Sequence, residues 1–228
     1  MQRTRNALIA GASGLVGGHC LNLLLKSNRY SQVISVGRHD LPLIHPKLDQ
    51  QKVDFDRLKS YASELAADDI YCCLGTTMKK AGSKEAFYKV DHTYVVQLAE
   101  LTVNKGASQF LVVSAMGADP GSLFFYNKVK GQMEHDVQQL GYDTVHIFRP
   151  SLLLGSREEE RTGEELASKI MKPLSSLMIG PLEKYKPIEA EDVAKAMLYA
   201  ASQDQKGVHI HPSDEIAHMG TNYSMSLS

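Results

Sequence analysis

The sequence predicts a doubly wound, parallel α/β sheet, and two observations carry this prediction. First, an apolar run at residues 6–10 leads into the glycine-rich turn Gly11-Ala12-Ser13-Gly14-Leu15-Val16-Gly17-Gly18, and an apolar helical pattern follows as far as Leu25. Second, five further short apolar runs alternate with helical patterns up to residue 150. A chain that alternates strands and helices in this way builds a parallel sheet with helices on both faces.

The composition excludes several classes of protein. The chain has 228 residues, 43% of them hydrophobic and 22% charged, so we expect one domain over residues 1–228 with a full core. The formal net charge of −1 provides no basic surface for nucleic acid. No apolar run approaches the roughly 20 residues of a membrane span. The three cysteines lack the spacing of metal ligands, so we expect buried, reduced thiols, no metal site and a cytoplasmic location.

The three glycines of the N-terminal turn are spaced three apart, as in turns that bind the diphosphate of a dinucleotide. Gly11 allows a tight turn out of the strand, Gly14 lets the backbone approach a pyrophosphate, and Gly17 lets the helix pack closely on the sheet. The first N–H groups of the helix then face the anion, at the positive end of the helix dipole. We therefore predict a Rossmann-type NAD(P) site; the alternative is a turn whose glycines are structural only. The predicted cofactor contacts here are Gly11, Ser13, Gly14, Leu15, Val16 and Gly17.

The residue after the second strand bears on the choice between NADP and NAD. The strand at residues 32–37 ends in Gly37-Arg38-His39, so Arg38 stands about 20 residues beyond Gly17. An acid at this place binds the ribose hydroxyls of NAD, whereas an arginine accommodates the 2′-phosphate of NADP. We predict that Arg38 binds NADP, with NAD as the less favoured cofactor; the alternative is a solvated surface arginine.

The next segments are predicted to complete the cofactor crevice. A third strand is expected at residues 51–55, and Asp54 either meets the adenine edge or caps a turn. A helix near 57–66 and an apolar strand at 69–74 follow. Small residues at the carboxyl end of such a strand line the crevice in which open α/β sheets bind ligands. Leu74, Gly75 and Thr76 are therefore predicted cofactor contacts.

The middle of the chain continues the alternation. Residues 78–83 are expected to form a basic loop, in which Lys79 and Lys80 either attract an acidic substrate or are simply solvated. A long helix is predicted from Ser83 to Asn104, closed by Gly106, and strands are predicted at 109–114 and 144–149 on either side of a helix at 123–140.

Beyond Pro150 the alternation is less regular, and we expect residues 151–228 to add a small subdomain on the substrate side. The charged run at 157–161 is expected to begin a solvated helix or a lid, with a helix around 164–178. A helix at 191–201 and a strand at 208–211 follow. The tail from 213 to 228 shows no apolar period and is expected to be loosely held.

Three residues form a candidate catalytic site. Ser114 ends the fifth strand, and Tyr126 and Lys130 stand four apart on the following helix, so their side chains share one face. An ammonium beside a phenol favours the phenolate. Ser114 can then hold a carbonyl oxygen and Tyr126 can pass it a proton, while a nicotinamide delivers hydride to the carbon. The alternative is a surface pair on the helix that only packs its side chains.

These residues resemble a known family. Gly11-x-x-Gly14-x-x-Gly17, Ser114, Tyr126-x-x-x-Lys130 and Arg149-Pro150 are similar to the atypical short-chain dehydrogenases/reductases. The segments 74–77, 80–83, 87–91, 114–118 and 125–131 resemble, over nearly the whole chain, the branch that includes the Tat-interacting-protein oxidoreductase and its bacterial relatives. The resemblance implies a Rossmann fold, NADP(H) binding and a Ser-Tyr-Lys site, with Tyr126, Lys130 and Arg149 also contacting the cofactor. It does not supply a substrate.

One position departs from the family pattern. Many members carry an asparagine on the helix after the fourth strand, where it helps a proton relay, and this chain has Asp91 near that place. The expected function is an NADP-dependent oxidoreductase acting on a carbonyl or alcohol of a small molecule. Two alternatives stay open: an NADP(H)-binding redox sensor or regulator without turnover, and a sugar-nucleotide epimerase or dehydratase. We expect no nucleic-acid or membrane partner, and leave open a homodimer or a protein partner.

Overall fold

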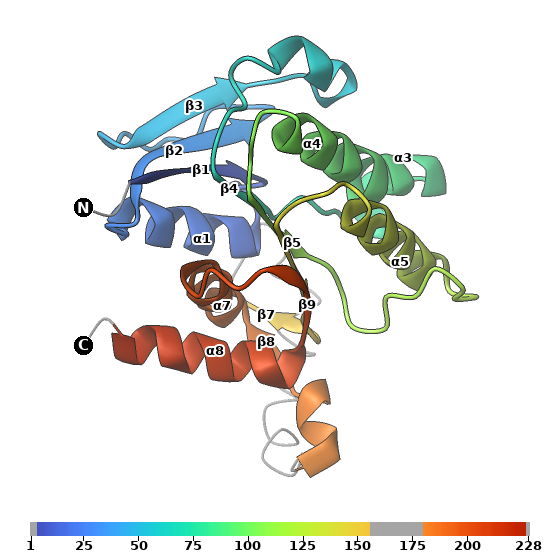
Figure 1. The fold of residues 1–228 in the computed structure, drawn as a ribbon. Coiled ribbons are helices and arrows are strands. Elements are labelled where there is room, and N and C mark those ends of the chain that lie inside the picture. The colour runs from blue at the N-terminus through green and yellow to red at the C-terminus, as the bar shows by residue number, and fades with distance from the viewer. Residues whose placement is uncertain (1–3, 156–179, 227–228) are drawn as a thin grey trace.

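The computed structural model describes residues 4–155 and 180–226, and its main element is one seven-stranded sheet (Figure 1). The strands lie in the order β3-β2-β1-β4-β5-β6-β9, and every neighbouring pair is parallel. Their bounds are Arg5–Ala10 (β1), Tyr30–Gly37 (β2), Leu48–Lys52 (β3), Asp69–Cys72 (β4), Gln109–Val113 (β5), Thr144–Arg149 (β6) and Gly207–Pro212 (β9). The predicted doubly wound α/β fold is confirmed.

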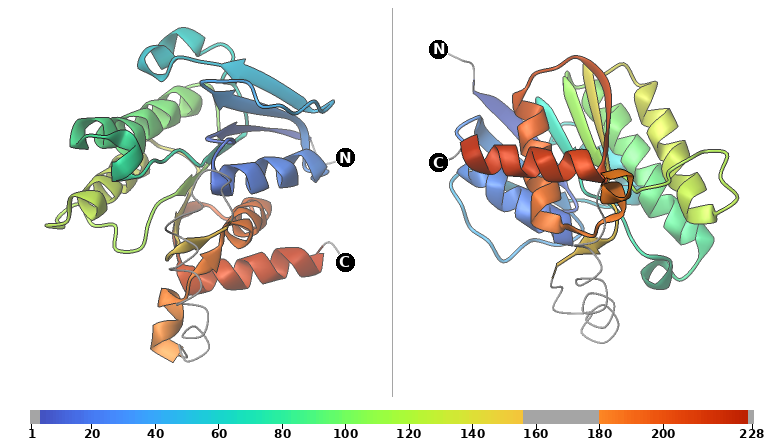
Figure 2. Two further views of the ribbon diagram at one scale, coloured as in Figure 1. Left: turned by 180° about the vertical axis from the view of Figure 1, so that it is seen from behind. Right: turned by 90° about the horizontal axis from the view of Figure 1, so that it is seen from below.

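Helices cover both faces of the sheet (Figures 1 and 2). One face carries α1 (Leu15–Lys26) and α7 (Ala190–Ser202), and the other carries α3 (Lys84–Tyr88), α4 (Tyr94–Val103) and α5 (Phe125–Gln138). Strand β1 lies inside the sheet and contributes to the core on both faces, because its successive side chains point to opposite faces. Ala7 and Ile9 join the core beneath α1 and α7, whereas Leu8 and Ala10 join the core beneath α4 and α5.

Two segments differ from the sequence prediction for local reasons. The third strand, predicted at 51–55, covers Leu48–Lys52, and the helical stretch predicted near 57–66 is a 3₁₀ helix over Phe55–Tyr61. The predicted loop at 78–83 contains the short helix α2 (Met78–Ala81). Thr77 caps it by accepting the N–H of Lys80, and Gly82 ends it at φ +78°, where glycine pays no steric cost.

The long helix predicted from Ser83 to Asn104 is present in extent but is not regular. Ser83 caps α3 by accepting the N–H of Ala86. Between α3 and α4 the chain makes a π-helical turn over Lys89–Thr93, which contains Asp91. Single π turns inside α-helices are rare and frequently lie at functional sites.

The C-terminal tail is a helix, so the prediction that it is loosely held is wrong. Helix α8 (Ser213–Ser226) packs on α7, and Ile216, Met219 and Tyr223 of α8 join the core beneath α7. These residues are three and four apart, an apolar stripe of helical period that the polar composition of the tail concealed.

The rest of the segment beyond Pro150 is only partly described. A two-stranded sheet pairs β7 (Leu153–Leu154) with β8 (Ile188–Glu189), and a 3₁₀ helix covers Gly180–Tyr185. Strand β9 and helix α7 complete the main sheet and its helical layer. The charged run predicted at 157–161 and the helix predicted at 164–178 lie outside the described residues.

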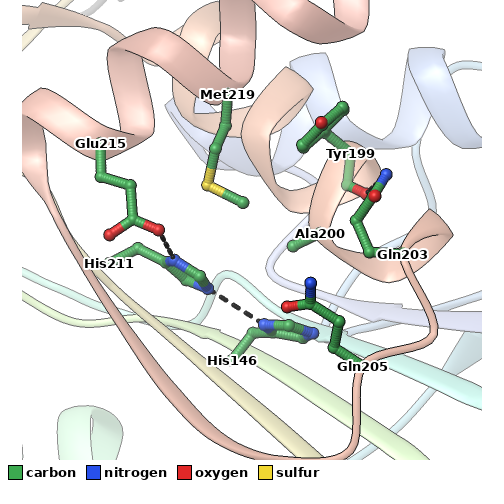
Figure 3. Close-up of a pocket in the computed structure, with 8 residues that line it drawn as sticks. All are labelled: His146, Tyr199, Ala200, Gln203, Gln205, His211, Glu215 and Met219. Atoms are coloured by element: carbon green, nitrogen blue, oxygen red, sulfur yellow. Dashed lines mark hydrogen bonds and ion pairs between the residues drawn. The ribbon is translucent and has the colours of Figure 1, made fainter.

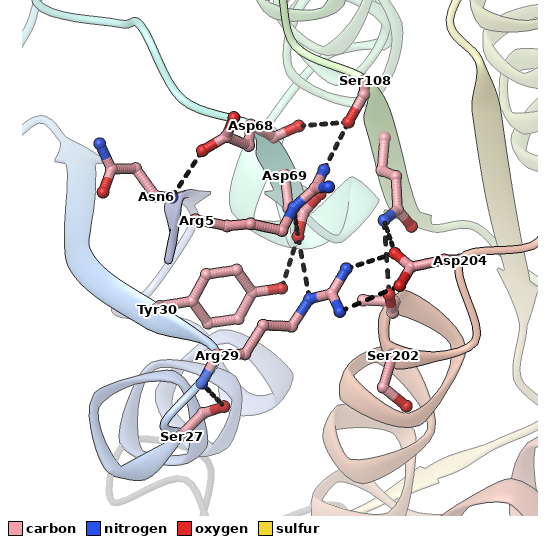
Figure 4. Close-up of polar contacts among 12 residues, drawn as sticks. Arg5, Asn6, Ser27, Arg29, Tyr30, Asp68, Asp69, Ser108, Ser202 and Asp204 are labelled. Carbon is pink, nitrogen blue, oxygen red and sulfur yellow. Dashed lines mark hydrogen bonds and ion pairs between the residues drawn. The ribbon is translucent and has the colours of Figure 1, made fainter. Parts of the chain in front are cut away.

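A buried carboxylate ties the amino end of the sheet together (Figure 4). Asp69, fully buried at the start of β4, accepts hydrogen bonds from Nη2 of Arg5 at 2.5 Å and from the hydroxyl of Tyr30 at 2.8 Å. Arg29 lies 3.4 Å from Asp69 and 2.6 Å from Asp204, just after α7. This cluster joins β1, β2 and β4 to the end of α7, at the edge opposite the carboxyl ends of the strands.

Candidate functional site

The predicted site residues gather at the carboxyl edge of the sheet, because all its strands are parallel. The strand order reverses between β1 and β4, and the crevice at such a reversal is where open α/β sheets bind ligands. The glycine-rich turn follows β1, and Gly75 and Thr76 follow β4. Ser114 follows β5, and Arg149 ends β6.

The turn after β1 has no room for side chains at two of its glycines. Gly11 has φ +87°, and a Cβ there would lie 2.5 Å from the carbonyl oxygen of Cys73. A Cβ on Gly17 would lie 2.1 Å from the carbonyl oxygen of Gly11. Gly14 precedes α1 with no side-chain cap, so the first N–H groups of α1 stay available for an anion. The turn therefore fits a dinucleotide pyrophosphate.

The residues predicted to meet the adenosine half follow the neighbouring strands. Arg38 is exposed directly after β2. Asp54 is also exposed, and its Oδ1 accepts the N–H of Asp56 at 3.0 Å. Of the two readings of Asp54, the turn cap is therefore present in the structure, and an adenine contact stays a prediction.

One face of α5 carries the candidate catalytic groups. Tyr126 and Lys130 lie one turn apart on it. The ring of Tyr126 packs on buried Phe87 of α3 with 5.5 Å between ring centroids, and 39% of the residue remains exposed. Lys130 is 4% exposed. A solvent-accessible phenol thus lies one helical turn from a buried ammonium.

Lys130 forms an ion pair with Asp91, a residue to which the sequence analysis assigned no role. Its Nζ lies 2.7 Å from Oδ1 of Asp91, which is 1% exposed. The other oxygen of Asp91 accepts the N–H of Thr76 at 2.8 Å. Burial acts to lower the pKa of Lys130, but the charges of Asp91 and Tyr126 outweigh it and raise that pKa above its usual value. The lysine therefore stays charged in spite of its burial.

The hydroxyl of Ser114 has a hydrogen-bond partner within the protein, Glu134. Ser114 is only 5% exposed, and its hydroxyl donates this hydrogen bond to Oε1 of Glu134. Arg149 holds the same carboxylate through Nε at 3.0 Å and Nη2 at 2.5 Å, and this bond raises the pKa of Arg149. Glu134 was missed by sequence reasoning, although it stands four residues after Lys130 on the same face of the helix. That spacing was the available signal.

A pocket of about 180 Å³ lies elsewhere, between β6, β9, α7 and α8 (Figure 3). Its lining includes His146, His211, Glu215 and Met219, and none of the predicted site residues. Within residues 4–155 and 180–226, no three His, Cys, Asp or Glu side chains are grouped so that they could hold a metal ion.

The parallel sheet, the strand-order reversal and the glycine turn define a Rossmann protein of the NAD-binding class. The chain belongs to the NAD dependent epimerase/dehydratase family, whose model matches residues 7–213. The predicted kinship with the atypical dehydrogenases/reductases is confirmed, because the relatives include Protein HTATIP2 of Rattus norvegicus. That protein is 39% identical over 176 residues, which cover 75% of this chain and 72% of the relative.

Other relatives are FMP52 proteins of fungi. FMP52 of Saccharomyces cerevisiae is 35% identical over 68% of this chain and 69% of its own length. FMP52 of Candida albicans is 30% identical over 98% of both chains. Both proteins are named mitochondrial.

Solved structures agree with the fold at low sequence identity. The Bordetella bronchiseptica enzyme WbmH in complex with NAD⁺ has a TM-score of 0.69 and 15% identity, over 92% of this chain and 76% of that one. MoeE5 in complex with UDP-glucuronic acid and NAD has a TM-score of 0.68 and 17% identity, over 96% and 82% of the two chains.

The expected cytoplasmic location is wrong, since several relatives are named mitochondrial. The expectation depended on reduced cysteines, and these do not distinguish one reducing compartment from another. Among the described helices, none has the length and apolar character needed to span a bilayer.

Proposed function

We propose that the protein is an NADP-dependent oxidoreductase that transfers hydride to or from a small carbonyl or alcohol substrate. The observation that carries this proposal is the arrangement on α5, where exposed Tyr126 lies one turn from Lys130, and Lys130 is paired with Asp91 beside the loop after β4. This loop contacts the glycine turn, because Gly11 packs against the backbone of Cys73. The lysine beside the candidate acid–base group is thus connected to the dinucleotide turn through Asp91 and this loop.

Each residue has a role that follows from its surroundings. Tyr126 exchanges a proton with the substrate oxygen, and Lys130, held by Asp91, lies one helical turn from it. In alcohol oxidation Tyr126 takes the hydroxyl proton while the carbon loses hydride; carbonyl reduction is the reverse. When bound, the nicotinamide accepts or supplies that hydride. Leu74, Gly75 and Thr76 line the nicotinamide site, and the N–H groups at the start of α1 bind the diphosphate.

The preference for NADP over NAD is assigned to Arg38. Its exposed guanidinium follows β2, and no described residue makes a hydrogen bond or ion pair with it that would compete with a phosphate. Changing Arg38 to Ala should reduce the ratio of NADPH to NADH affinity, measured by calorimetry, by about tenfold or more, the loss of roughly one charge-assisted hydrogen bond. An unchanged ratio removes this assignment.

The central test compares the protein with Tyr126→Phe on a panel of aldehydes and ketones with NADPH. The variant should lose at least about a hundredfold in kcat, the usual contribution of a positioned acid–base group, while its affinity for NADPH falls far less, because the diphosphate is bound by the N–H groups at the start of α1. Tyr185, exposed and remote from α5 in sequence, provides a matched control as Tyr185→Phe. Equal low rates for the protein and Tyr126→Phe would favour the alternative, an NADP(H)-binding sensor or regulator of a protein partner.

The epimerase alternative has its own discriminating assay. The similar solved chains include proteins in complex with UDP-sugars, but this chain spans only 76% to 82% of the lengths of WbmH and MoeE5. Conversion of UDP-glucose without net change in the nicotinamide would favour an epimerase.

The role of Ser114 needs a separate test, because its hydroxyl is engaged by Glu134. If Ser114 holds the substrate oxygen, Ser114→Ala should lower kcat/KM for carbonyl reduction by tenfold or more with little change in melting temperature. If it only anchors Glu134, the same variant should lower the melting temperature and leave kcat/KM unchanged. The second result would remove Ser114 from the catalytic set.

A further inference from the structure

The π turn between α3 and α4 brings a carboxylate into the candidate site. Asp91 lies within this turn and is 1% exposed, although its neighbours Lys89 and Val90 are more exposed. A buried carboxylate is costly unless it is paired and hydrogen-bonded. The π turn that buries the Asp91 carboxylate must therefore place it beside a charged or hydrogen-bonding partner.

Asp91 has two partners, and both belong to the candidate site. One oxygen lies 2.7 Å from Nζ of Lys130 on α5, and the other accepts the N–H of Thr76 at 2.8 Å. The space beside the pair depends on Gly75, because a Cβ there would lie 3.3 Å from the carboxylate oxygen of Asp91 and 3.8 Å from Nζ of Lys130. The carboxylate thus joins the loop after β4, which faces the dinucleotide turn, to the lysine beside Tyr126.

We propose that Asp91 is a positioning residue, which keeps the Lys130 ammonium charged and fixes it between Tyr126 and the cofactor-side loop. The inference rests on the proposed function for its catalytic meaning, but the pairing itself makes no use of turnover. A carboxylate here stabilises the buried ammonium more than a neutral amide at the same place would, because its charge adds to the hydrogen bond.

Three described groups act to raise the pKa of Lys130, and Asp91 contributes most. They are Asp91 from the π turn, Tyr126 from α5 itself and Cys72 from β4. Burial raises the pKa of Cys72 to about 12, so its thiol is neutral at physiological pH. Tyr126 is neutral whenever it carries the proton that it is to donate. Removing the charge of Asp91 therefore leaves a desolvated lysine with no permanent counter-charge.

The test variant is Asp91→Asn, which keeps the size of the side chain and an oxygen to accept the N–H of Thr76. Lys130 should then lose its proton at least about two pH units lower than in the unchanged protein, a hundredfold weaker hold on the proton. The measurement is NMR of lysine labelled with ¹³C at Cε, with the Lys130 signal assigned by its absence in Lys130→Arg. In the same variant, the alkaline limb of the pH–rate profile should move to lower pH.

Asp56→Asn is the matched control. Asp56 lies 2.6 Å from Nζ of Lys89, the first residue of the same π turn, but that pair is half exposed. This variant should leave the titration of Lys130 and the pH–rate profile unchanged. If Asp91→Asn also leaves the titration of Lys130 unchanged, the proposal is overturned.

A second variant keeps the proposal testable if Asp91→Asn does not fold. Asp91→Glu retains the charge but moves it by one methylene, so Lys130 should stay charged while kcat falls and melting temperature changes little. A merely structural Asp91 would instead lower the melting temperature and leave kcat unchanged, which contradicts the proposal. If the unchanged protein shows no turnover but Lys130 titrates as expected in the variants, the proposed reaction fails and the charge-holding role stands.

Discussion

The stability of the protein should fall between pH 6.5 and pH 3 because His146 cannot take up a proton in the folded state. His146 lies on β6 and is 1% exposed, and its Nδ1 lies 3.0 Å from Nε2 of His211 (Figure 3). His211 Nδ1 lies 2.8 Å from a carboxylate oxygen of Glu215. Because Glu215 can only accept, His211 donates to it through Nδ1 and accepts from Nδ1 of His146. That assignment leaves Nε2 of His146 as a buried acceptor with no partner among the described residues.

The size of the effect follows from the pKa. Burial, with smaller contributions from His211 and His209, lowers the pKa of His146 from 6.5 to about 3. In the unfolded chain His146 binds a proton as the pH falls below 6.5, whereas in the folded protein it stays neutral down to about pH 3. The free energy of unfolding therefore decreases as the pH falls through this window. One proton corresponds to about 1.4 kcal/mol per pH unit, which makes about 2 kcal/mol between pH 6 and pH 4.5.

The assay is urea unfolding at half-unit steps from pH 4.5 to pH 6, for the protein and for His146→Gln. Carboxylates change the stability of both over this range, so the difference between the two slopes isolates His146. The variant should lose about 2 kcal/mol less than the unchanged protein, whereas His39→Gln, which alters an exposed histidine, should lose as much as the unchanged protein. Slopes that agree within about 0.5 kcal/mol for all three would refute the reasoning.

Two further predictions concern packing and charge, and urea unfolding checks both. Gly17→Ala places a Cβ 2.1 Å from the carbonyl oxygen of Gly11, so it should destabilise the protein by about 1–3 kcal/mol and weaken NADPH binding. Gly18→Ala, whose Cβ would lie 3.6 Å from its nearest neighbour, should instead stabilise by up to about 1 kcal/mol, and equal effects would contradict the packing argument. Asp69→Asn should cost about 3–5 kcal/mol, since it leaves two arginines facing a neutral amide in a buried cluster. Asp204→Asn removes a half-exposed carboxylate from the same cluster and should cost under about 1 kcal/mol. A similar loss of stability in Asp69→Asn and Asp204→Asn would contradict the argument that burial makes the ion pairs of Asp69 the stronger ones.

Much of the fold was predictable because its signals are local. The glycine turn needs its glycines for reasons that act over a few residues, and the structure shows the φ of +87° at Gly11 and the contact at Gly17 that those reasons require. Strand β6 was predicted at its observed bounds, because Gly141 and Pro150 limit the apolar run on both sides and so fix where a strand can begin and end. The sequence prediction was wrong where the apolar stripe was thin, as in α8, whose three core residues stand among polar ones.

The site was predictable in part. Tyr126 and Lys130 share a face because they are four apart on a helix, and any helix would bring them together. The partner of Lys130 was not predictable from spacing, because Asp91 is 39 positions away and reaches it through a π turn that has no signature in the sequence. Nor was the pairing of Ser114 with Glu134, because it depends on how closely α5 packs on β5.

By itself the sequence determined the order of strands and helices, the dinucleotide turn and the spacing of the two groups on α5, since each depends on residues within a turn or two of one another. Only the tertiary structure decided which charges meet. Asp91 with Lys130, Glu134 with Ser114 and Arg149, and the neutral His146 all depend on burial and on packing between distant segments. Desolvation is a property of the folded surroundings and has no counterpart along the chain.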